Sequence, residues 1–416
     1  MKVCSPEVVL KRAKPGCKVS VILIDWGVRE SFHGVEYLNR QTVARSDYEL
    51  IWLEFYDRRP EGLRKIVDSG VDGQPALDQW IVAGYGDAGI YSKHRLYNIG
   101  ILAAQGEICV ICDSDAMFTP TFIEKIIQGF AETPRAVIHL DEIRNNDHSF
   151  FPFRYPSLDE VRGKGCINWQ GTISVGLDNH SDMLHKANYG ACMAAKRADL
   201  IAVGGADEHL DYLGYVCGPY ELTFRLMNYG LEERWLRDEY LYHTWHPNEN
   251  SINTEYHGPH DGRFMSLRAL EALADGRVLP CLENPWIARA RRGERLELDA
   301  VLRLAADKEE PEWRNGNQPT SWDGVYWMKR DFEGFNLYVH KDRWYGLKVG
   351  EGAFNPRLAW RYRVLIETDN QEQTRQEIHY YNQLPTGLWD RMWVHPPHRL
   401  PIRVWRRLSK ELARLF

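Results

Sequence analysis

The sequence predicts an α/β fold with a largely parallel sheet flanked by helices, followed by a small β-rich module. Residues 18–26, KVSVILIDW, form a continuous β-branched apolar run ending near Asp25, which is typical of a strand buried on both faces. A stretch with helical spacing over 34–42 leads to a second apolar strand over 48–57, and this order begins a doubly wound sheet. From about residue 321, aromatic and polar residues alternate between glycine-containing turns, which predicts antiparallel strands.

The other elements of the predicted sheet follow in chain order. Residues 92–107 have helical spacing and stop at Gly106, and the apolar run after them, EICVIC, predicts a third strand. A helix begins near Thr119 with Pro120 in its first turn. Residues 141–180 are polar and irregular, which favours a substrate loop over a linker. The remaining elements are a strand and helix within 188–205, a helix within 217–230 and a closing strand over 239–247.

Length and composition limit the organisation and the class of protein. At 416 residues the chain exceeds one typical hydrophobic core. We expect a catalytic α/β domain over 1–275, a helical connector over 276–320, and a β-rich module over 321–416 that ends in a basic amphipathic helix. A net charge of −6, with 26% charged and 44% hydrophobic residues, is ordinary for a globular enzyme and argues against a nucleic-acid binder.

Targeting and cysteine patterns favour a cytoplasmic protein. No apolar run approaches the ~18 residues of a membrane span, and the start of the chain lacks the apolar region of a secretory signal. The eight cysteines lack the paired spacing of a disulfide framework, so we expect reduced thiols. Cys109 and Cys112 form a C-x-x-C inside an apolar run, which is more typical of a core strand than of a metal or redox site.

Acidic residues follow three of the predicted strands. Asp113, Ser114 and Asp115 come after the third strand, and two carboxylates at alternate positions offer hard oxygen ligands to Mn²⁺ or Mg²⁺. The structural alternative is a pair of acids at a strand-to-loop junction. Asp25 and Glu54 lie at the ends of the first two strands. Because open α/β sheets bind ligands at the carboxyl ends of their strands, the sequence predicts a ligand site there.

Several motifs in order, over about residues 18–250, resemble the family-two group of inverting glycosyltransferases. The motifs are VSVILID, ELIWLEFYD, YNIGILAAQGEICVICDSD and IAVGGADEHL. The resemblance implies a GT-A type nucleotide-binding mixed sheet flanked by helices. It also implies metal-dependent transfer of a sugar from a nucleotide-sugar donor, a UDP-sugar first of all, to a carbohydrate or other hydroxyl acceptor.

The same resemblance assigns roles at the strand ends. It implies that Asp25 and Glu54 contact the nucleoside, that Asp113 lies near the ribose, and that Asp115 holds the metal ion. The full set of expected donor-binding residues is Asp25, Glu54, Asn98, Asp113, Ser114 and Asp115.

The family often takes a further metal ligand from a histidine after the acceptor helix, and this chain reads YHTWHP there. Neutral imidazole is a good ligand for Mn²⁺, and the turn at Pro247 would aim His246 at the diphosphate with His243 close by. The structural alternative is a packed or surface histidine. We expect Asp115 and His246 to hold the ion and His243 to contribute less.

The acceptor helix departs from the family pattern. Relatives often carry Gly-Glu-Asp and another acid, whereas this chain reads GPYE over 218–221. The resemblance therefore implies Glu221 as the general base that removes the acceptor proton, with Asp207 and Glu208 as alternatives. The structural alternative for Glu221 is an ion pair with Arg225, its i+4 neighbour.

Aromatic residues of 141–180 and 209–220 are candidates for stacking on sugar faces, and core packing is the alternative for each. Trp169 is the first of them to test, because it lies in a polar stretch. The basic amphipathic segment over 398–416 is a candidate for contact with an anionic membrane surface or a partner, with packing on the β-rich module as the alternative.

Two other functions compete with sugar transfer. Nucleotidyl transfer to a sugar phosphate uses similar sheets, but its Gly-rich signature with Arg and Lys is absent after Ile24. A non-catalytic carbohydrate-binding or scaffold protein derived from the GT-A fold is the second alternative, because the acceptor-helix motif is altered.

Overall fold

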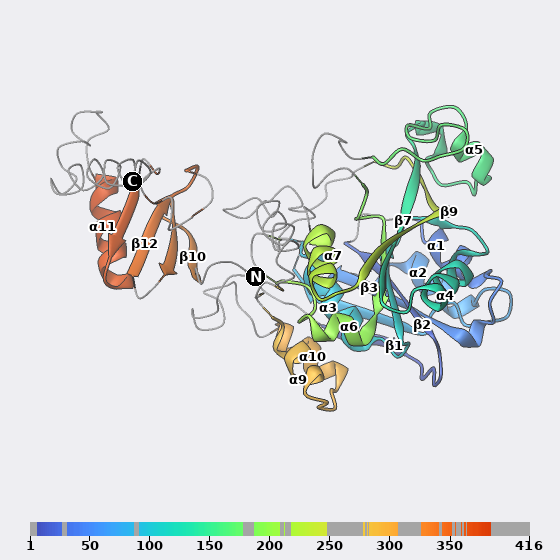
Figure 1. Cartoon of the computed structure of the whole chain (residues 1–416), viewed down its shortest axis with the longest axis horizontal. Helices are drawn as coiled ribbons and strands as arrows, with labels where there is room; N and C mark the ends of the chain where they lie inside the picture. The colour runs from blue at the N-terminus through green and yellow to red at the C-terminus, as the bar shows by residue number, and fades with distance from the viewer. Residues whose placement is uncertain are drawn as a thin grey trace. The chain divides into compact units, whose positions relative to one another are not determined.

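The structure is a computed structural model that divides into two compact units (Figure 1). The larger unit contains residues 1–258 and 262–309, and the smaller contains 259–261 and 310–416. The described residues are 6–26, 31–86, 91–177, 187–208, 212, 218–247, 278, 281, 283–306, 326–340, 343–351, 354, 359, 362 and 364–383.

A nine-stranded sheet forms the centre of the larger unit, in the order β1-β4-β3-β2-β5-β8-β7-β9-β6. Its strands are β1 (Glu7–Lys11), β2 (Val19–Asp25), β3 (Tyr48–Tyr56), β4 (Gln79–Tyr85), β5 (Ile108–Asp113), β6 (Met117–Phe118), β7 (Ala136–Asn145), β8 (Cys192–Lys196) and β9 (Glu232–Thr244). Strands β4, β3, β2 and β5 are parallel, as are β7 and β9, whereas β1, β8 and β6 pair antiparallel with their neighbours. The predicted mixed α/β sheet is therefore confirmed.

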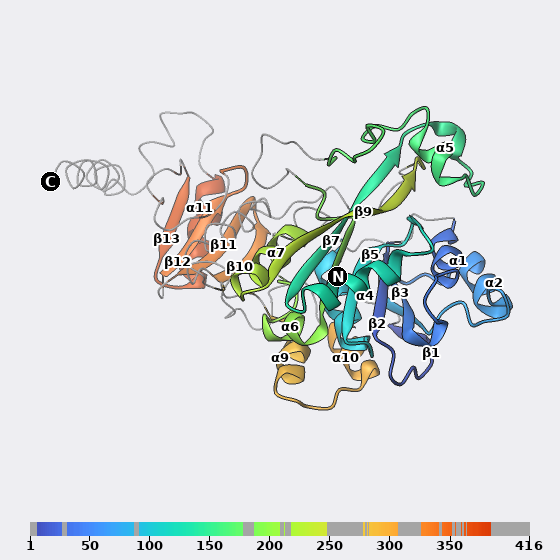
Figure 2. The same cartoon turned by 45° about the vertical axis from the view of Figure 1, so that its right-hand side comes forward.

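Helices cover both faces of this sheet because alternate residues of its buried strands point to opposite sides. Ile22 and Ile24 of β2 pack in one apolar cluster with α3, α6, α7, α9 and α10, whereas Val21 and Leu23 pack in another with α1, α2 and α4. Figures 1 and 2 show α6, α7 and α9 across the strands from α1 and α2. The helices are α1 (His33–Asn39), α2 (Glu61–Ser69), α3 (Lys93–Ala103), α4 (Phe122–Glu132), α5 (Leu158–Arg162), α6 (Arg197–Ala202), α7 (Gly218–Asn228), α9 (Pro285–Arg291) and α10 (Leu298–Ala306).

Two stretches of the larger unit differ from the sequence-based expectation. The expected irregular region from 141 begins inside β7, which runs to Asn145, and contains the short helix α5 with a Ser157–Glu160 capping box. Helices α9 and α10, in the expected connector, pack Trp286 and Val301 into the same cluster as α3. Their apolar faces make them part of the larger unit.

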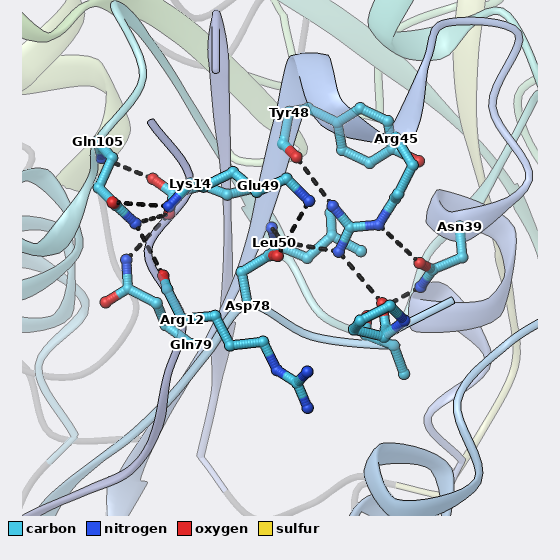
Figure 3. A network of polar contacts seen from close by, with 12 residues as sticks. Arg12, Lys14, Asn39, Arg45, Tyr48, Glu49, Leu50, Asp78, Gln79 and Gln105 are labelled. Atoms are coloured by element: carbon cyan, nitrogen blue, oxygen red, sulfur yellow. Dashed lines mark hydrogen bonds and ion pairs between the residues drawn. The ribbon is translucent and has the colours of Figure 1, made fainter. Parts of the chain in front are cut away.

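A network of ion pairs and hydrogen bonds links the amino ends of the parallel strands (Figure 3). Asp78, before β4, pairs with Lys14 at 3.2 Å and with Arg45 at 2.6 Å, and it accepts a hydrogen bond from the Leu50 amide. The fully buried Glu49 is held by neutral donors from three segments: Ser20 Oγ (2.6 Å), Gln79 Nε2 (3.0 Å) and Gln105 Nε2 (2.7 Å). Satisfying these buried carboxylates fixes the end of the sheet opposite the predicted ligand site.

The smaller unit contains a four-stranded antiparallel sheet in the order β10-β11-β12-β13. Its strands are β10 (Tyr326–Phe332), β11 (Phe335–His340), β12 (Arg343–Lys348) and β13 (Leu365–Thr368). Helix α11 (Gln371–Gln383), which the sequence pattern did not predict, packs Ile378 and Tyr381 against Phe335 and Leu337. The expected basic helix over 398–416 lies outside the described residues. In the part of the chain that the structure describes, no helix is long and apolar enough to cross a membrane.

Candidate active site

The acids predicted at the strand ends lie side by side at the carboxyl edge of the sheet. Asp25 of β2 is directly opposite Glu54 of β3, and β2 also pairs in parallel with β5, which ends at Asp113. Asp25 and Glu54 are buried, and the Ser114 hydroxyl donates a hydrogen bond to Asp25 at 3.2 Å. Burial, and then the charge of Asp25, raise the pKa of Glu54 well above its usual value.

Asp115 and two histidines form a compact group, called the triad below. The Nε2 atoms of His243 and His246 lie 3.0 and 3.1 Å from the same Asp115 carboxylate oxygen. One ligand atom from each residue lies within 4.8 Å of the others, which is close enough to hold one metal ion. Strand β9 brings the histidines there, because its Tyr242 pairs with Met117 just after Asp115.

The start of α1 packs tightly against the Asp-Ser-Asp segment. His33 makes a hydrogen bond through Nε2 to the backbone oxygen of Asp115 at 3.0 Å. A Cβ at Gly34 would lie 2.7 Å from the backbone oxygen of Ser114, closer than real Cβ contacts allow. A residue without a side chain is therefore needed where this helix crosses the loop.

Two charged residues of β7, missed by the sequence analysis, lie beside His243. Glu142 Oε1 is 3.8 Å from His243 Nδ1 and 3.1 Å from Arg144 Nε. Burial alone would raise the pKa of Glu142, but Arg144 and His243 outweigh it and lower that pKa. The available signal was an acid and an arginine two apart in DEIR, where both point to one face of a strand.

Lys93, the first residue of α3, is another missed site residue. Its Nζ lies 3.1 Å from Asp113 Oδ1 and 5.7 Å from the centre of the Trp26 ring. The lysine is largely buried, so its ammonium group is held at the strand ends by this ion pair. Its signal was a lysine at the start of a helix that precedes the Asp-Ser-Asp strand.

Asn98 also lies on α3, and its side-chain amide binds the Gly-Gly-Ala-Asp-Glu turn of residues 204–208. Its Nδ2 donates to the Ala206 oxygen at 2.9 Å and to Glu208 at 3.0 Å, and its Oδ1 accepts from the Ala206 amide at 2.8 Å. Gly205, at a φ of +70°, approaches this amide so closely that a Cβ would be 2.3 Å from Asn98 Oδ1. The amide thus positions the turn.

The three candidate bases are all buried. Glu208 accepts hydrogen bonds from Asn98 at 3.0 Å and from Asn284 at 2.6 Å, which ties the turn to the start of α9. Asp207 accepts a hydrogen bond at its backbone oxygen from the ring of His94, and its carboxyl interacts electrostatically with Glu221.

Glu221 forms the ion pair with Arg225 that was its structural alternative. Arg225 Nε lies 3.2 Å from Glu221 Oε1, and the two side chains are 0% and 2% exposed. Burial raises the pKa of Glu221 to about 8, with Arg225 opposing and Asp207 adding to the rise. Arg225 also donates to the backbone oxygens of Val203 and Gly205, so it joins α7 to the turn.

Trp169 is half-buried and packs against residues of α5 and β9. The Arg162 guanidinium lies 4.8 Å from the centre of its ring, and Tyr240 meets it edge to face at 5.7 Å. These contacts correspond to the packing alternative. Nearer the triad, Trp245 stacks on His148 with ring centres 3.7 Å apart.

Residues 92–200 match the family described as Glycosyl transferase family 2. No curated protein sequence matches the chain. The matched region contains α3, β5, the Asp-Ser-Asp segment, β7 and β8. The match places a family-two glycosyltransferase segment within a mixed α/β sheet of the GT-A type. The resemblance to the family-two glycosyltransferases is thus confirmed over the part of the chain that carries Asp113 and Asp115.

Among solved structures, the chain is similar to S. aureus TarS 1-349 in complex with UDP-GlcNAc, with a TM-score of 0.43 and 15% identity over 66% of this chain and 70% of that chain. Another crystal structure of TarS 1-349 gives a TM-score of 0.39 and 14% identity, and the chain spans 60% of its length. The mannosyltransferase PcManGT from Pyrobaculum calidifontis, in complex with GDP-Man and Mn²⁺, has a TM-score of 0.38 and 15% identity over 72% of this chain and 83% of that chain. The nucleotide sugars are ligands of those proteins.

Proposed function

We propose that this glycosyltransferase transfers a sugar, with inversion, from a nucleotide-sugar donor to an acceptor hydroxyl, and that it requires a divalent metal ion. A UDP-sugar is the first candidate donor, and a carbohydrate or other hydroxyl compound is the acceptor. The observation that carries this proposal is the triad of Asp115, His243 and His246, next to the acids at the strand ends. A metal group at the carboxyl edge of such a sheet suits a nucleoside diphosphate.

The donor set of the triad fits a divalent ion. One carboxylate and two imidazoles suit Mn²⁺ better than Mg²⁺, because Mg²⁺ prefers oxygen ligands. When bound, the ion supplies positive charge that stabilises the leaving diphosphate. Asp115, His243 and His246 would hold it, while His33 keeps the Asp115 backbone in place.

The nucleoside part of the donor is proposed to bind at Asp25 and Glu54, with Asp113 near the ribose. Carboxylates accept hydrogen bonds from ribose hydroxyls and base N–H groups. Burial and the charge of Asp25 raise the pKa of Glu54 and so favour its protonated form, which would donate a hydrogen bond to a base carbonyl. Ser114 supports this part of the site through its hydrogen bond to Asp25.

For the general base we propose Glu221, with Asp207 and Glu208 as the alternatives. An inverting reaction needs one carboxylate to accept the acceptor proton as the hydroxyl attacks the anomeric carbon. A pKa raised to about 8 makes Glu221 a stronger base than an ordinary glutamate. Glu221 is also buried and contacts Arg225, so the turnover of Glu221→Gln and the pH–rate profile decide whether it is the base.

The proposal is tested by thermal shift with UDP-, GDP- and TDP-sugars, each with and without Mn²⁺. A ligand that binds the folded protein raises its melting temperature, and we expect one nucleotide series to do so in a Mn²⁺-dependent way. Asp115→Asn should remove the Mn²⁺ dependence and the turnover. Asp72→Asn, the same change at an exposed surface ion pair, is the matched control and should behave as wild type. Unchanged metal dependence in Asp115→Asn would refute the metal assignment.

The altered acceptor helix supports one second candidate, a non-catalytic carbohydrate-binding protein. The GPYE segment over 218–221 lacks the usual pair of acids. Metal-dependent donor hydrolysis or transfer, measured as release of free nucleotide, separates the two functions. Binding of donor without any release would favour the second candidate.

We also propose a cytoplasmic protein whose basic segment over 398–416 makes a peripheral contact with anionic lipid. Arginine and lysine residues alternate there with apolar residues, as in helices that lie in a membrane interface. Co-sedimentation with anionic vesicles should pull down the full chain more than a version that ends at Pro397. Equal binding would favour packing of the segment on the β-rich module.

A further inference from the structure

Glu142 and Arg144 form a two-point ion pair on one face of β7. Arg144 Nε lies 3.1 Å from Glu142 Oε1, and its Nη2 lies 3.4 Å from Glu142 Oε2. Glu142 is buried, and the Asn188 side chain donates a further hydrogen bond to it at 3.2 Å. The carboxylate is therefore fixed, and the guanidinium fork is oriented by two bonds instead of one.

This ion pair lies directly beside the triad. Arg144 is paired in register with His243 on the neighbouring strand β9. Glu142 Oε1 is 3.8 Å from His243 Nδ1, so the arginine, the glutamate and the histidine share one face of the sheet. The charges of Asp115 and Asp113 also act on Arg144 and favour its cationic form, after the larger effect of Glu142.

The Arg144 side chain remains accessible to a ligand. The side chain remains 40% exposed although Glu142 binds two of its nitrogens. Among the described residues, nothing accepts a hydrogen bond from its Nη1. A guanidinium has five N–H donors in a planar fork, and its free edge matches two oxygens of a phosphate.

We propose that Arg144 binds the diphosphate of the nucleotide-sugar donor, as a cation fixed in place beside the metal ion. Lys93 is largely buried and paired with Asp113, whereas Arg144 is exposed, lies next to the triad and is oriented by a buried acid. Charge on the leaving diphosphate grows as the glycosidic bond breaks, and an oriented cation stabilises that charge. This inference rests on the proposed nucleotide-sugar donor.

The test compares nucleotides with and without phosphate groups. Binding of UDP, uridine, GDP and guanosine is measured by calorimetry with Mn²⁺ present, for wild type and for Arg144→Gln, Arg144→Lys and Arg154→Gln. Arg154 is the matched control, because it is a 57% exposed arginine of the same region, paired loosely with Glu160 at 3.9 Å.

Arg144→Gln should weaken binding of the diphosphate about tenfold to a hundredfold, as loss of a charge-assisted hydrogen bond does, and leave the nucleoside unaffected. Arg144→Lys should recover part of that loss, because it restores the charge without the fork. The control should bind as wild type. Unchanged diphosphate affinity in Arg144→Gln, or an equal loss for nucleoside and diphosphate, would overturn the inference. If wild type binds neither nucleotide, the donor proposal itself fails.

Discussion

Replacing Glu221 by glutamine should change how the stability of the protein depends on pH. Glu221 has a pKa of about 8 in the folded protein against an ordinary value of 4.5. Between these two values the folded chain keeps a proton that the unfolded chain releases, so this group makes the protein less stable as pH rises. At ~1.4 kcal/mol for each pH unit, the whole interval corresponds to an upper limit on the order of 5 kcal/mol.

Glutamine stays neutral, so the stability of Glu221→Gln relative to wild type should increase from pH 5 to about pH 8 and then level off. The assay is denaturant unfolding followed by tryptophan fluorescence at each pH, because titration of groups that do not interact with Glu221 cancels in the comparison. Glu61→Gln is the matched control: Glu61 also pairs with a basic residue four positions on, Lys65, but on an exposed helix. Its pH-dependent difference should be much smaller. A flat difference for Glu221→Gln would show that Glu221 is ionised throughout, as a strong ion pair with Arg225.

Two further predictions concern the triad and its support. His243→Ala and His246→Ala should both weaken Mn²⁺ binding, because both rings lie equally close to the same carboxylate oxygen of Asp115. Measured by calorimetry, each loss of affinity should be at least the ~10–100-fold that follows from removing a residue that only supports a metal ligand. A loss in only one variant would leave the other histidine without a metal role. Gly34→Ala should also weaken Mn²⁺ binding, because its Cβ would push on the Ser114 oxygen at 2.7 Å. Gly190→Ala, whose Cβ would meet its nearest neighbour at an ordinary 3.6 Å, is the control, and an equal effect of both would contradict this reasoning.

Strands β2, β3 and β5 could be predicted from the sequence because each is largely apolar with polar residues after it, whereas β4 (QWIVAGY) was missed. In β2 and β5 no residue between the first and the last strand position is charged, and such runs form strands buried on both faces. Strand β7 was not predicted, and its polar second half, DEIRN, was assigned to the irregular region that starts at residue 141. Asp141 and Glu142 are nevertheless buried, and β7 pairs with the distant strand β9, which leaves no periodic signal in the sequence of β7.

In the candidate site, too, only some of the residues could be predicted from the sequence. Asp25 and Asp115 could be predicted because they follow apolar strands, and strand ends meet at one edge of a parallel sheet. Glu142 and Arg144 could not, since their importance comes from the register that sets Arg144 beside His243. Asn98 was expected near the donor, and in the structure its side-chain amide binds the turn that contains Gly205. This contact depends on the close approach of Gly205 to Asn98, which only the folded chain shows.

The buried acids around Arg225 also determine which pH–rate profile each candidate base would give. Glu221 and Asp207 both interact electrostatically with the guanidinium of Arg225, and repulsion between the two acids adds to the burial that raises the pKa of Glu221. With a pKa of about 8, Glu221 would be mostly protonated at neutral pH, and it could accept a proton only in its ionised form.

If Glu221 is the base, kcat/KM should rise about tenfold per pH unit up to pH ~8 and then level off. Glu221→Gln would then lose ~10²–10⁴-fold in turnover while donor and Mn²⁺ affinity stay near wild type. A profile already level at pH 7, with turnover lost in Asp207→Asn instead, would assign the proton transfer to Asp207. Glu221 would then be a neutral partner that lets Arg225 hold the backbone oxygens of Val203 and Gly205.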